Sequence, residues 1–149
     1  MKKHELTNEY FMNIALKEAK KAFLKKEVPV GCVIVDDKNR ILAKSHNLKE
    51  KSNNPLKHAE MIAIAKATKK NKNWRLSNCR IYITLEPCSM CYSAIKQSFI
   101  KKIYYAADSN NEHRFSKDLI NNTVEIEKGL LADDVKSMLS DFFKKIRSN

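Results

Sequence analysis

The sequence lacks several features that mark particular protein classes. No run of apolar residues is long enough to span a bilayer, so we expect no membrane helix. The basic start of the chain, Met1 to Glu5, is not followed by an apolar segment, and we therefore expect no secretory signal. There is no internal repeat and no interdomain linker. The length of 149 residues suits one domain, residues 1–149, with a single buried core.

Acidic residues are scarce relative to basic ones. The chain has 29 Lys and Arg against 17 Asp and Glu, which gives a net charge of +12. Such an excess favours a polyanionic partner, because contacts with phosphates release counterions. The 4 cysteines, in a chain for which no secretory signal is expected, indicate a reducing compartment. We therefore expect a cytoplasmic protein.

Helical periodicity predicts four helices. The first spans Thr7–Glu27, the second begins at His58, the third follows Pro87, and the last follows Gly129. The residues expected to face inward on the first two are Phe11, Ile14, Ala15, Ala19, Ala22, Phe23, Met61, Ile62, Ala65 and Thr68. On the last two they are Ala94, Ile95, Phe99, Leu131, Val135, Met138, Leu139, Phe142 and Ile146.

Apolar runs and alternation predict five strands, at residues 32–35, 41–43, 79–85, 102–107 and 123–127. The near-continuous apolar run at 32–35 is typical of a strand that is covered on both faces. A turn joins it to the second strand as an antiparallel hairpin, whereas the strand–helix–strand unit at 79–107 should be parallel. The sum predicts an α/β protein, with a five-stranded mixed sheet in a three-layer α/β/α sandwich.

Two cysteines follow the third predicted strand in the segment Leu85-Glu86-Pro87-Cys88-Ser89-Met90-Cys91. Proline fits the first turn of a helix, because the amide that it lacks would be unpaired there. Cys88 and Cys91 would then lie on one face of that turn, where backbone amides and the helix dipole favour thiolates. Two thiolates fill only half of a tetrahedral metal site.

His58-Ala59-Glu60 supplies what the cysteine pair lacks. His58 is the expected third ligand, and three protein ligands leave the fourth position open for water, as in catalytic zinc sites. Glu60 is placed to handle the protons of that water. Helix N-termini gather at the carboxyl ends of strands, so the two motifs should converge. We therefore predict one Zn²⁺ per chain, held by His58, Cys88 and Cys91.

The combination of H-x-E with a later P-C-x-x-C is the signature of zinc nucleobase deaminases. With Glu27-Val28-Pro29-Val30-Gly31, Ser45-His46-Asn47 and Gly129-Leu130-Leu131-Ala132-Asp133, the chain resembles the bacterial tRNA-specific adenosine deaminases over nearly its whole length. The tail Leu139 to Lys145 resembles that family too. The resemblance implies a cytidine-deaminase-like fold, and a hydrolase that converts adenosine to inosine at the wobble position. It also implies a tRNA anticodon stem-loop as partner, an arginine tRNA with an ACG anticodon as substrate, and a homodimer.

The resemblance also assigns roles to single residues. It implies that Glu60 takes the proton of the water and passes protons to ring N1 and to the departing amine. It implies that the target base is bound by Asn47, Ala59, Pro29 and Val30.

The tail offers further contacts to RNA. Phe142 or Phe143 could stack on a base, and Lys144, Lys145 and Arg147 could contact phosphates. Neighbouring residues on a helix point in different directions, so we expect one of the two phenylalanines in the core and the other nearer the RNA.

The chain departs from its family after the fourth predicted strand. Relatives carry Gly-Ala-x-Asp-x-Lys-x-Gly there, whereas this chain reads Ala106-Ala107-Asp108-Ser109-Asn110-Asn111-Glu112-His113. Either Asp108 or Ser109 takes the place of the family's aspartate, so the segment 106–121 leaves the substrate contacts open.

Two other functions are compatible with the same motifs. A deaminase of this fold could act on a free base or nucleoside, such as guanine or cytosine. Alternatively, the chain could be a catalytically silent RNA-binding or structural zinc module. Glu60 argues against the silent module, because a structural site needs no proton shuttle and would take a fourth protein ligand.

Overall fold

The computed structural model describes residues 7–109 and 124–148. In chain order the elements are α1 (Asn8–Leu24), β1 (Gly31–Asp36), β2 (Ile41–His46), α2 (Ala59–Asn71), β3 (Cys79–Leu85), α3 (Ser89–Gln97), β4 (Lys102–Ala107), β5 (Glu125–Lys128) and α4 (Ala132–Ser148). The predicted order of helices and strands is confirmed. No helix in these two ranges is long and apolar enough to cross a membrane.

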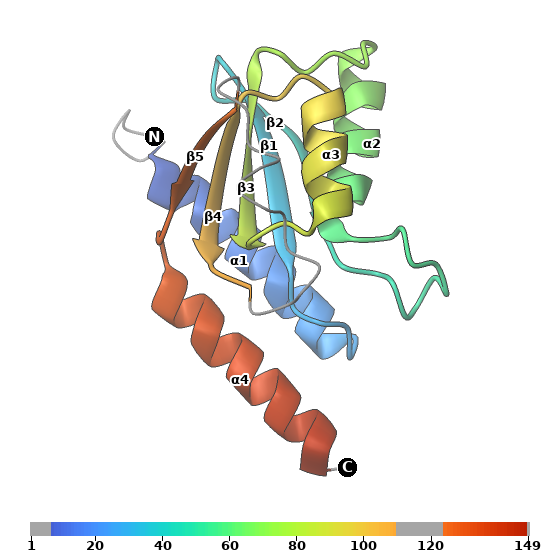
Figure 1. Ribbon diagram of the computed structural model, residues 1–149, viewed down its shortest axis with the longest axis vertical. Helices are drawn as coiled ribbons and strands as arrows, with labels where there is room; N and C mark the ends of the chain where they lie inside the picture. Colours follow the sequence, from blue (N-terminus) through green and yellow to red (C-terminus); the bar gives the residue numbers. More distant parts are fainter. Residues whose placement is uncertain (1–6, 110–123, 149) are drawn as a thin grey trace.

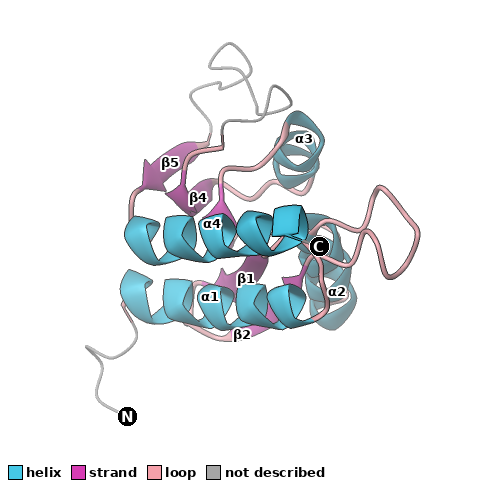
Figure 2. Ribbon diagram, turned by 90° about the horizontal axis from the view of Figure 1, so that it is seen from below, coloured by secondary structure: helices cyan, strands magenta, loops and turns pink. Residues whose placement is uncertain are grey.

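The sheet has the strand order β2-β1-β3-β4-β5 and is mixed. β1 runs antiparallel to both β2 and β3, whereas the pairs β3–β4 and β4–β5 are parallel. Helices α2 and α3 cover one face (Figure 1), and α1 and α4 lie side by side on the other (Figure 2). The three-layer α/β/α architecture is therefore confirmed.

Strand β1 shows why an apolar run without alternation predicts a central strand. All its residues are buried. Cys32 and Ile34 pack into the core under α2 and α3, while Val33 and Val35 pack into the core under α1. Both faces of the strand are thus apolar, as a sheet between two helical layers requires.

The inward face of α2 differs from the prediction. Ala59, Ala63 and Ala67 are buried, Met61 and Ile62 are half-buried, and Ala65 is exposed. Alanines four residues apart form a flat strip that lets the helix lie close to the sheet. Periodicity alone did not distinguish this strip from the larger residues beside it.

Three further details differ. Phe99 lies beyond the end of α3 in a left-handed conformation and is 46% exposed. Ile146 was expected to face inward but is 54% exposed. The buried residues of α4 are Val135 and Phe142. The last strand begins at Glu125, and Thr123 lies outside the described residues.

Candidate active site

The predicted metal ligands sit at the N-termini of α2 and α3. His58 and Cys88 are the N-cap residues, both with extended backbone, and neither side chain makes a capping hydrogen bond of the usual kind. We had predicted Pro87 within the first turn of the helix. It lies instead before the N-cap residue Cys88. Cys91 is the third residue of α3, and the N-cap and third positions of a helix face the same side. The two thiols therefore point to one place although the helix begins later than expected.

The imidazole of His58, at the start of α2, lies next to the two thiols at the start of α3. Its Nδ1 lies 3.7 Å from Sγ of Cys88 and 3.5 Å from Sγ of Cys91. All three ligand atoms lie within 4.8 Å of one another. In a tetrahedral site with Zn–S of about 2.3 Å and Zn–N of about 2.0 Å, neighbouring ligand atoms are roughly 3.5–3.8 Å apart. The two distances from His58 therefore match those of a tetrahedral Zn²⁺ site.

The electrostatics of the cluster favour a cation. Hydrogen bonds from the Cys91 thiol and from His58 lower the pKa of Cys88 to about 4, although burial opposes this. The pKa of Cys91 is raised by the neighbouring Cys88 and by burial. One thiolate is thus already stable, and a bound cation would favour the second.

Glu60 lies in the first turn of α2 and is only 4% exposed. Burial raises its pKa to about 7, although a backbone amide and His58 act in the opposite direction. A carboxyl group that titrates near neutral pH can both accept and donate a proton, as an acid–base catalyst must.

A cavity of about 200 Å³ opens beside the cluster. It is lined by Glu27, Val28, Val30, Asn47, Lys49, Glu50, His58, Ala59, Glu60, Leu85, Glu86, Cys88 and Ser109. Of the predicted substrate-binding residues, Val30, Asn47 and Ala59 line it. Pro29 is buried outside the lining, and Val28 takes its place in the wall. Sequence reasoning missed Glu27, which forms part of the Glu27–Gly31 motif but had been assigned no role.

Asn47 is held in place by its own side-chain amide. Its Nδ2 donates to the carbonyl of Val28 at 3.3 Å, and its Oδ1 accepts the N–H of Lys49 at 3.1 Å. A primary amide has two N–H groups and two acceptor lone pairs. One of each remains for a ligand in the cavity.

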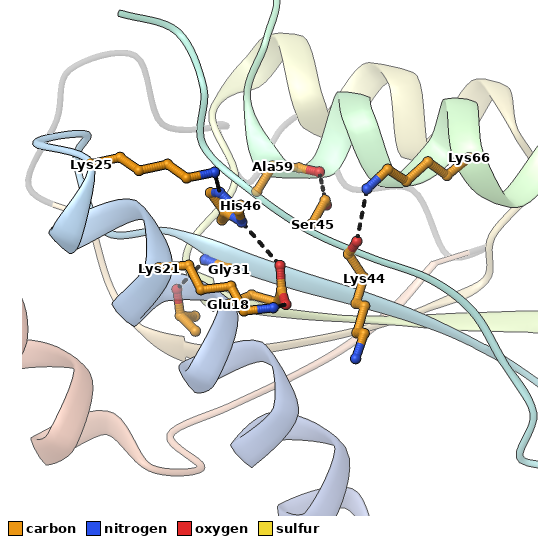
Figure 3. A network of polar contacts seen from close by, with 10 residues as sticks. Glu18, Lys21, Lys25, Gly31, Lys44, Ser45, His46, Ala59 and Lys66 are labelled. Carbon is orange, nitrogen blue, oxygen red and sulfur yellow. Dashed lines mark hydrogen bonds and ion pairs between the residues drawn. The ribbon is translucent and has the colours of Figure 1, made fainter. Parts of the chain in front are cut away.

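The residues just before Asn47 attach the end of β2 to both helical layers (Figure 3). The Ser45 hydroxyl donates to the carbonyl of Ala59 at 2.6 Å, which ties β2 to the first turn of α2. His46 contacts Lys25 through Nε2 at 2.9 Å and Glu18 through Nδ1 at 3.0 Å. Because a lysine ammonium only donates, Nε2 accepts and Nδ1 carries the proton that bonds Glu18.

Comparison with known proteins gives the chain a family. The family model for the cytidine and deoxycytidylate deaminase zinc-binding region matches residues 6–107. The tRNA-specific adenosine deaminase of Streptococcus pyogenes serotype M18 is 41% identical over 146 residues, covering 93% of this chain and 91% of that protein. This chain belongs to the tRNA-specific adenosine deaminase family.

Solved structures agree with this family. A tRNA:A34 deaminase, studied for A-to-I editing at the wobble position of transfer RNA, is 32% identical with a TM-score of 0.79. The match covers 87% of this chain and 98% of that one. The guanine deaminase of Nitrosomonas europaea has a TM-score of 0.83 at 20% identity, covering 91% of this chain and 84% of that one. This second likeness shows a shared fold alone.

The structure distinguishes the two candidates for the aspartate of the tRNA-specific adenosine deaminase family. Ser109 lines the cavity, and its N–H donates to Oε1 of Glu86 at 2.9 Å. Asp108 accepts from the Tyr105 hydroxyl at 3.1 Å and from Lys128 at 3.2 Å, and it does not line the cavity. Of the two, Ser109 is therefore the residue at the cavity. Residues 110–121 of the altered segment lie outside the described residues.

The two phenylalanines of the family's tail are also distinguished. Phe142 is 4% exposed and packs edge-on against Phe23 at 5.7 Å, whereas Phe143 is 42% exposed. The positive side chains that follow it, Lys144, Lys145 and Arg147, are exposed. The C-terminal halves of α1 and α4 lie at the same end of the sheet as the N-termini of α2 and α3 (Figure 1). The C-terminal half of α4, which contains Phe143, thus lies toward the end of the molecule that holds the cavity.

Proposed function

We propose that this chain is a hydrolase that converts adenosine to inosine at the wobble position of a tRNA anticodon and releases ammonia. An arginine tRNA with an ACG anticodon is the proposed substrate. The observation that carries the proposal is the His58–Cys88–Cys91 cluster beside the buried Glu60, in a chain that belongs to the tRNA-specific adenosine deaminase family.

The cluster would hold one Zn²⁺ per chain through Nδ1 of His58 and the two thiolates. When bound, the ion lowers the pKa of a coordinated water toward neutrality. The Glu60 carboxylate accepts one proton from the attacking water and passes it to ring N1 of the adenine. As the C6–O bond forms and the C6–N bond breaks, Glu60 transfers the second proton of the water to the departing amine. Water and adenosine thus give inosine and ammonia, and Glu60 returns to its starting state.

Asn47 would orient the base through the N–H and the lone pair that its internal bonds leave over. Val28, Val30 and Ala59 form the apolar wall around that base. An adenine within an anticodon loop must leave its stack to enter the cavity. Phe143 would then stack on a neighbouring base, and Lys144, Lys145 and Arg147 would contact phosphates. We further propose that the protein works as a homodimer in the cytoplasm, where its tRNA substrate is found.

The test is inosine formation in an arginine tRNA that carries an ACG anticodon. The matched control is the same tRNA with cytosine at the wobble position. We expect inosine in the first and no change in the second. Zinc-loaded protein that leaves both tRNAs unchanged but deaminates guanine or cytosine would overturn the tRNA assignment. Zinc-loaded protein that deaminates no substrate would overturn the enzyme assignment as well.

A further inference from the structure

Glu27 is a buried carboxylate that the proposed chemistry does not use. It is 0% exposed and lines the cavity. Its two oxygens accept the backbone N–H groups of Glu50 at 2.9 Å and Lys51 at 2.6 Å. Within residues 7–109 and 124–148, no Lys, Arg or His forms an ion pair with it. The two amides therefore replace the water that a buried carboxylate has lost.

Both amides belong to the segment that joins β2 to α2, which we name the rim loop (residues 48–57). The loop is closed at its base, where the N–H of Leu48 donates to the carbonyl of Lys57 at 3.0 Å. It projects from the end of the sheet that holds the N-termini of α2 and α3 (Figure 1). Lys49 and Glu50 of the rim loop line the cavity. Glu27 thus bonds the part of the loop that borders the cavity.

We propose that Glu27 is a positioning residue that locks the rim loop in the conformation that receives RNA, with Lys49 placed to contact a phosphate. This inference rests on the proposed function. The residues on either side of the loop have anchors of their own. The N–H of Asn47 donates to the carbonyl of Val30 at 3.1 Å, and Ser45 bonds Ala59 next to His58. Loss of the Glu27 contacts therefore loosens the rim loop, including the Lys49 N–H that donates to Asn47, but leaves the backbone of Asn47 and the predicted metal ligands in place.

Glu27→Gln is the sharpest variant, because it keeps the size of the side chain. One oxygen becomes an NH₂ group, which faces an N–H and cannot accept from it. The matched control is Asp36→Asn. Asp36 is 2% exposed, and its carboxylate also accepts two backbone N–H groups, those of Lys38 and Arg40, each at 2.9 Å. These lie in the turn between β1 and β2, away from the cavity lining.

The experiment measures KM and kcat on the anticodon stem-loop, the zinc content, and hydrogen exchange at the amides of Glu50 and Lys51. In Glu27→Gln we expect KM to rise about tenfold, kcat to change less than about twofold, and the zinc content to stay that of the natural protein. The two amides should exchange faster. Lys49→Ala should raise KM without changing the exchange, and Asp36→Asn should change neither.

Unchanged exchange at Glu50 and Lys51 in Glu27→Gln would overturn the proposal, whatever the kinetics. A normal KM, a fall in kcat with lost zinc, or an equal rise of KM in Asp36→Asn would overturn it too. If the natural protein deaminates no RNA, the proposed function fails, and the RNA part of this inference fails with it. The exchange measurement would then still decide whether Glu27 holds the loop.

Discussion

At the scale of single residues, the N-cap residues of α2 and α3 are suited to binding a metal and poorly suited to stabilising the helices. N-caps are usually Ser, Thr, Asp or Asn, whose side chains bond the first amides of the helix. His58 and Cys88 occupy these positions and make no such bond. The lost cap costs each helix about 1 kcal/mol. In return, both side chains are free to turn toward the site of the metal.

Glu60→Gln should keep the fold and the zinc but lose nearly all turnover. Glutamine has the same shape, but it cannot take a proton from water, and proton transfer is typically worth about 10²–10⁴ in rate. Zinc per chain and the rate of inosine formation are the measurements. Cys88→Ala is the companion variant and should lose the metal. Near-normal turnover in Glu60→Gln would remove Glu60 from the proton transfers.

Asp36 should contribute stability that disappears in acid. Burial alone would raise its pKa, but hydrogen bonds from the N–H groups of Arg40 and Lys38 and from the Arg40 side chain outweigh it and lower the pKa from 3.8. Because the folded state favours the ionised form, the contribution is complete above the ordinary pKa and is lost as pH falls through the lowered one.

The measurement is the difference in unfolding free energy between the natural protein and Asp36→Asn. We expect the variant to be less stable at neutral pH, and the difference to shrink as pH falls below about 4. Loss of zinc in acid affects both proteins, so it cancels in the difference. A difference that stays constant from neutral pH into acid would contradict the assignment.

At the scale of elements, the contact between α1 and β1 is unusually close at Gly31. A Cβ added there would lie 1.9 Å from the carbonyl oxygen of Ala15 and 2.6 Å from the nitrogen of Ala19. Both are backbone atoms of α1, so no side chain can move aside. Glycine in this strand therefore sets how near the first helix lies to the sheet.

Gly31→Ala should lower the unfolding free energy by about 3 kcal/mol or more, since overpacking against rigid backbone forces elements apart. Denaturant unfolding measures the change. Lys44→Ala, at an exposed position of the neighbouring β2, is the control and should stay within about 0.5 kcal/mol of the natural protein. A Gly31→Ala protein as stable as this control would show that α1 can shift freely.

On α4, alanine substitutions of the neighbouring residues Phe142 and Phe143 should have different effects, the first on stability and the second on RNA binding. Phe142→Ala removes a buried ring and should cost about 3 kcal/mol of unfolding free energy. Phe143→Ala should cost less than about 0.5 kcal/mol but weaken stem-loop binding about tenfold, because stacking on a base is lost. Melting curves and RNA titrations measure the two effects. Equal RNA affinity in Phe143→Ala and the natural protein would remove that ring from the interface.

At the scale of the whole molecule, positive charge is unevenly distributed along the chain. Between residues 61 and 107 the only acidic residue is Glu86, and this segment includes most of α2 and all of β3, α3 and β4. On α2, Lys66, Lys69 and Lys70 are exposed. Within α2 and α3, at whose N-termini the predicted metal ligands lie, the only acidic residue is Glu60.

Binding of the stem-loop should weaken steeply with salt. Each phosphate contact on single-stranded RNA contributes a slope of about −0.7 in a plot of log K against log salt. Four such contacts would raise Kd roughly 50-fold when salt increases fourfold. Titrations at several salt concentrations give the slope. A Kd for the stem-loop that does not depend on salt would contradict these phosphate contacts.

The sequence by itself determined the order of helices and strands and the zinc-binding motif. Periodicity is local, and the spacing of Cys88 and Cys91 brings both thiols to one side of a helix start even though Pro87 lies before the cap. Only the tertiary structure decided which side chains meet in the cavity. Ser109 rather than Asp108 lines it, Val28 rather than Pro29 forms its wall, and Glu27 reaches the rim loop. These outcomes depend on the direction in which each side chain points once distant elements pack together, and local spacing carries no information about that direction.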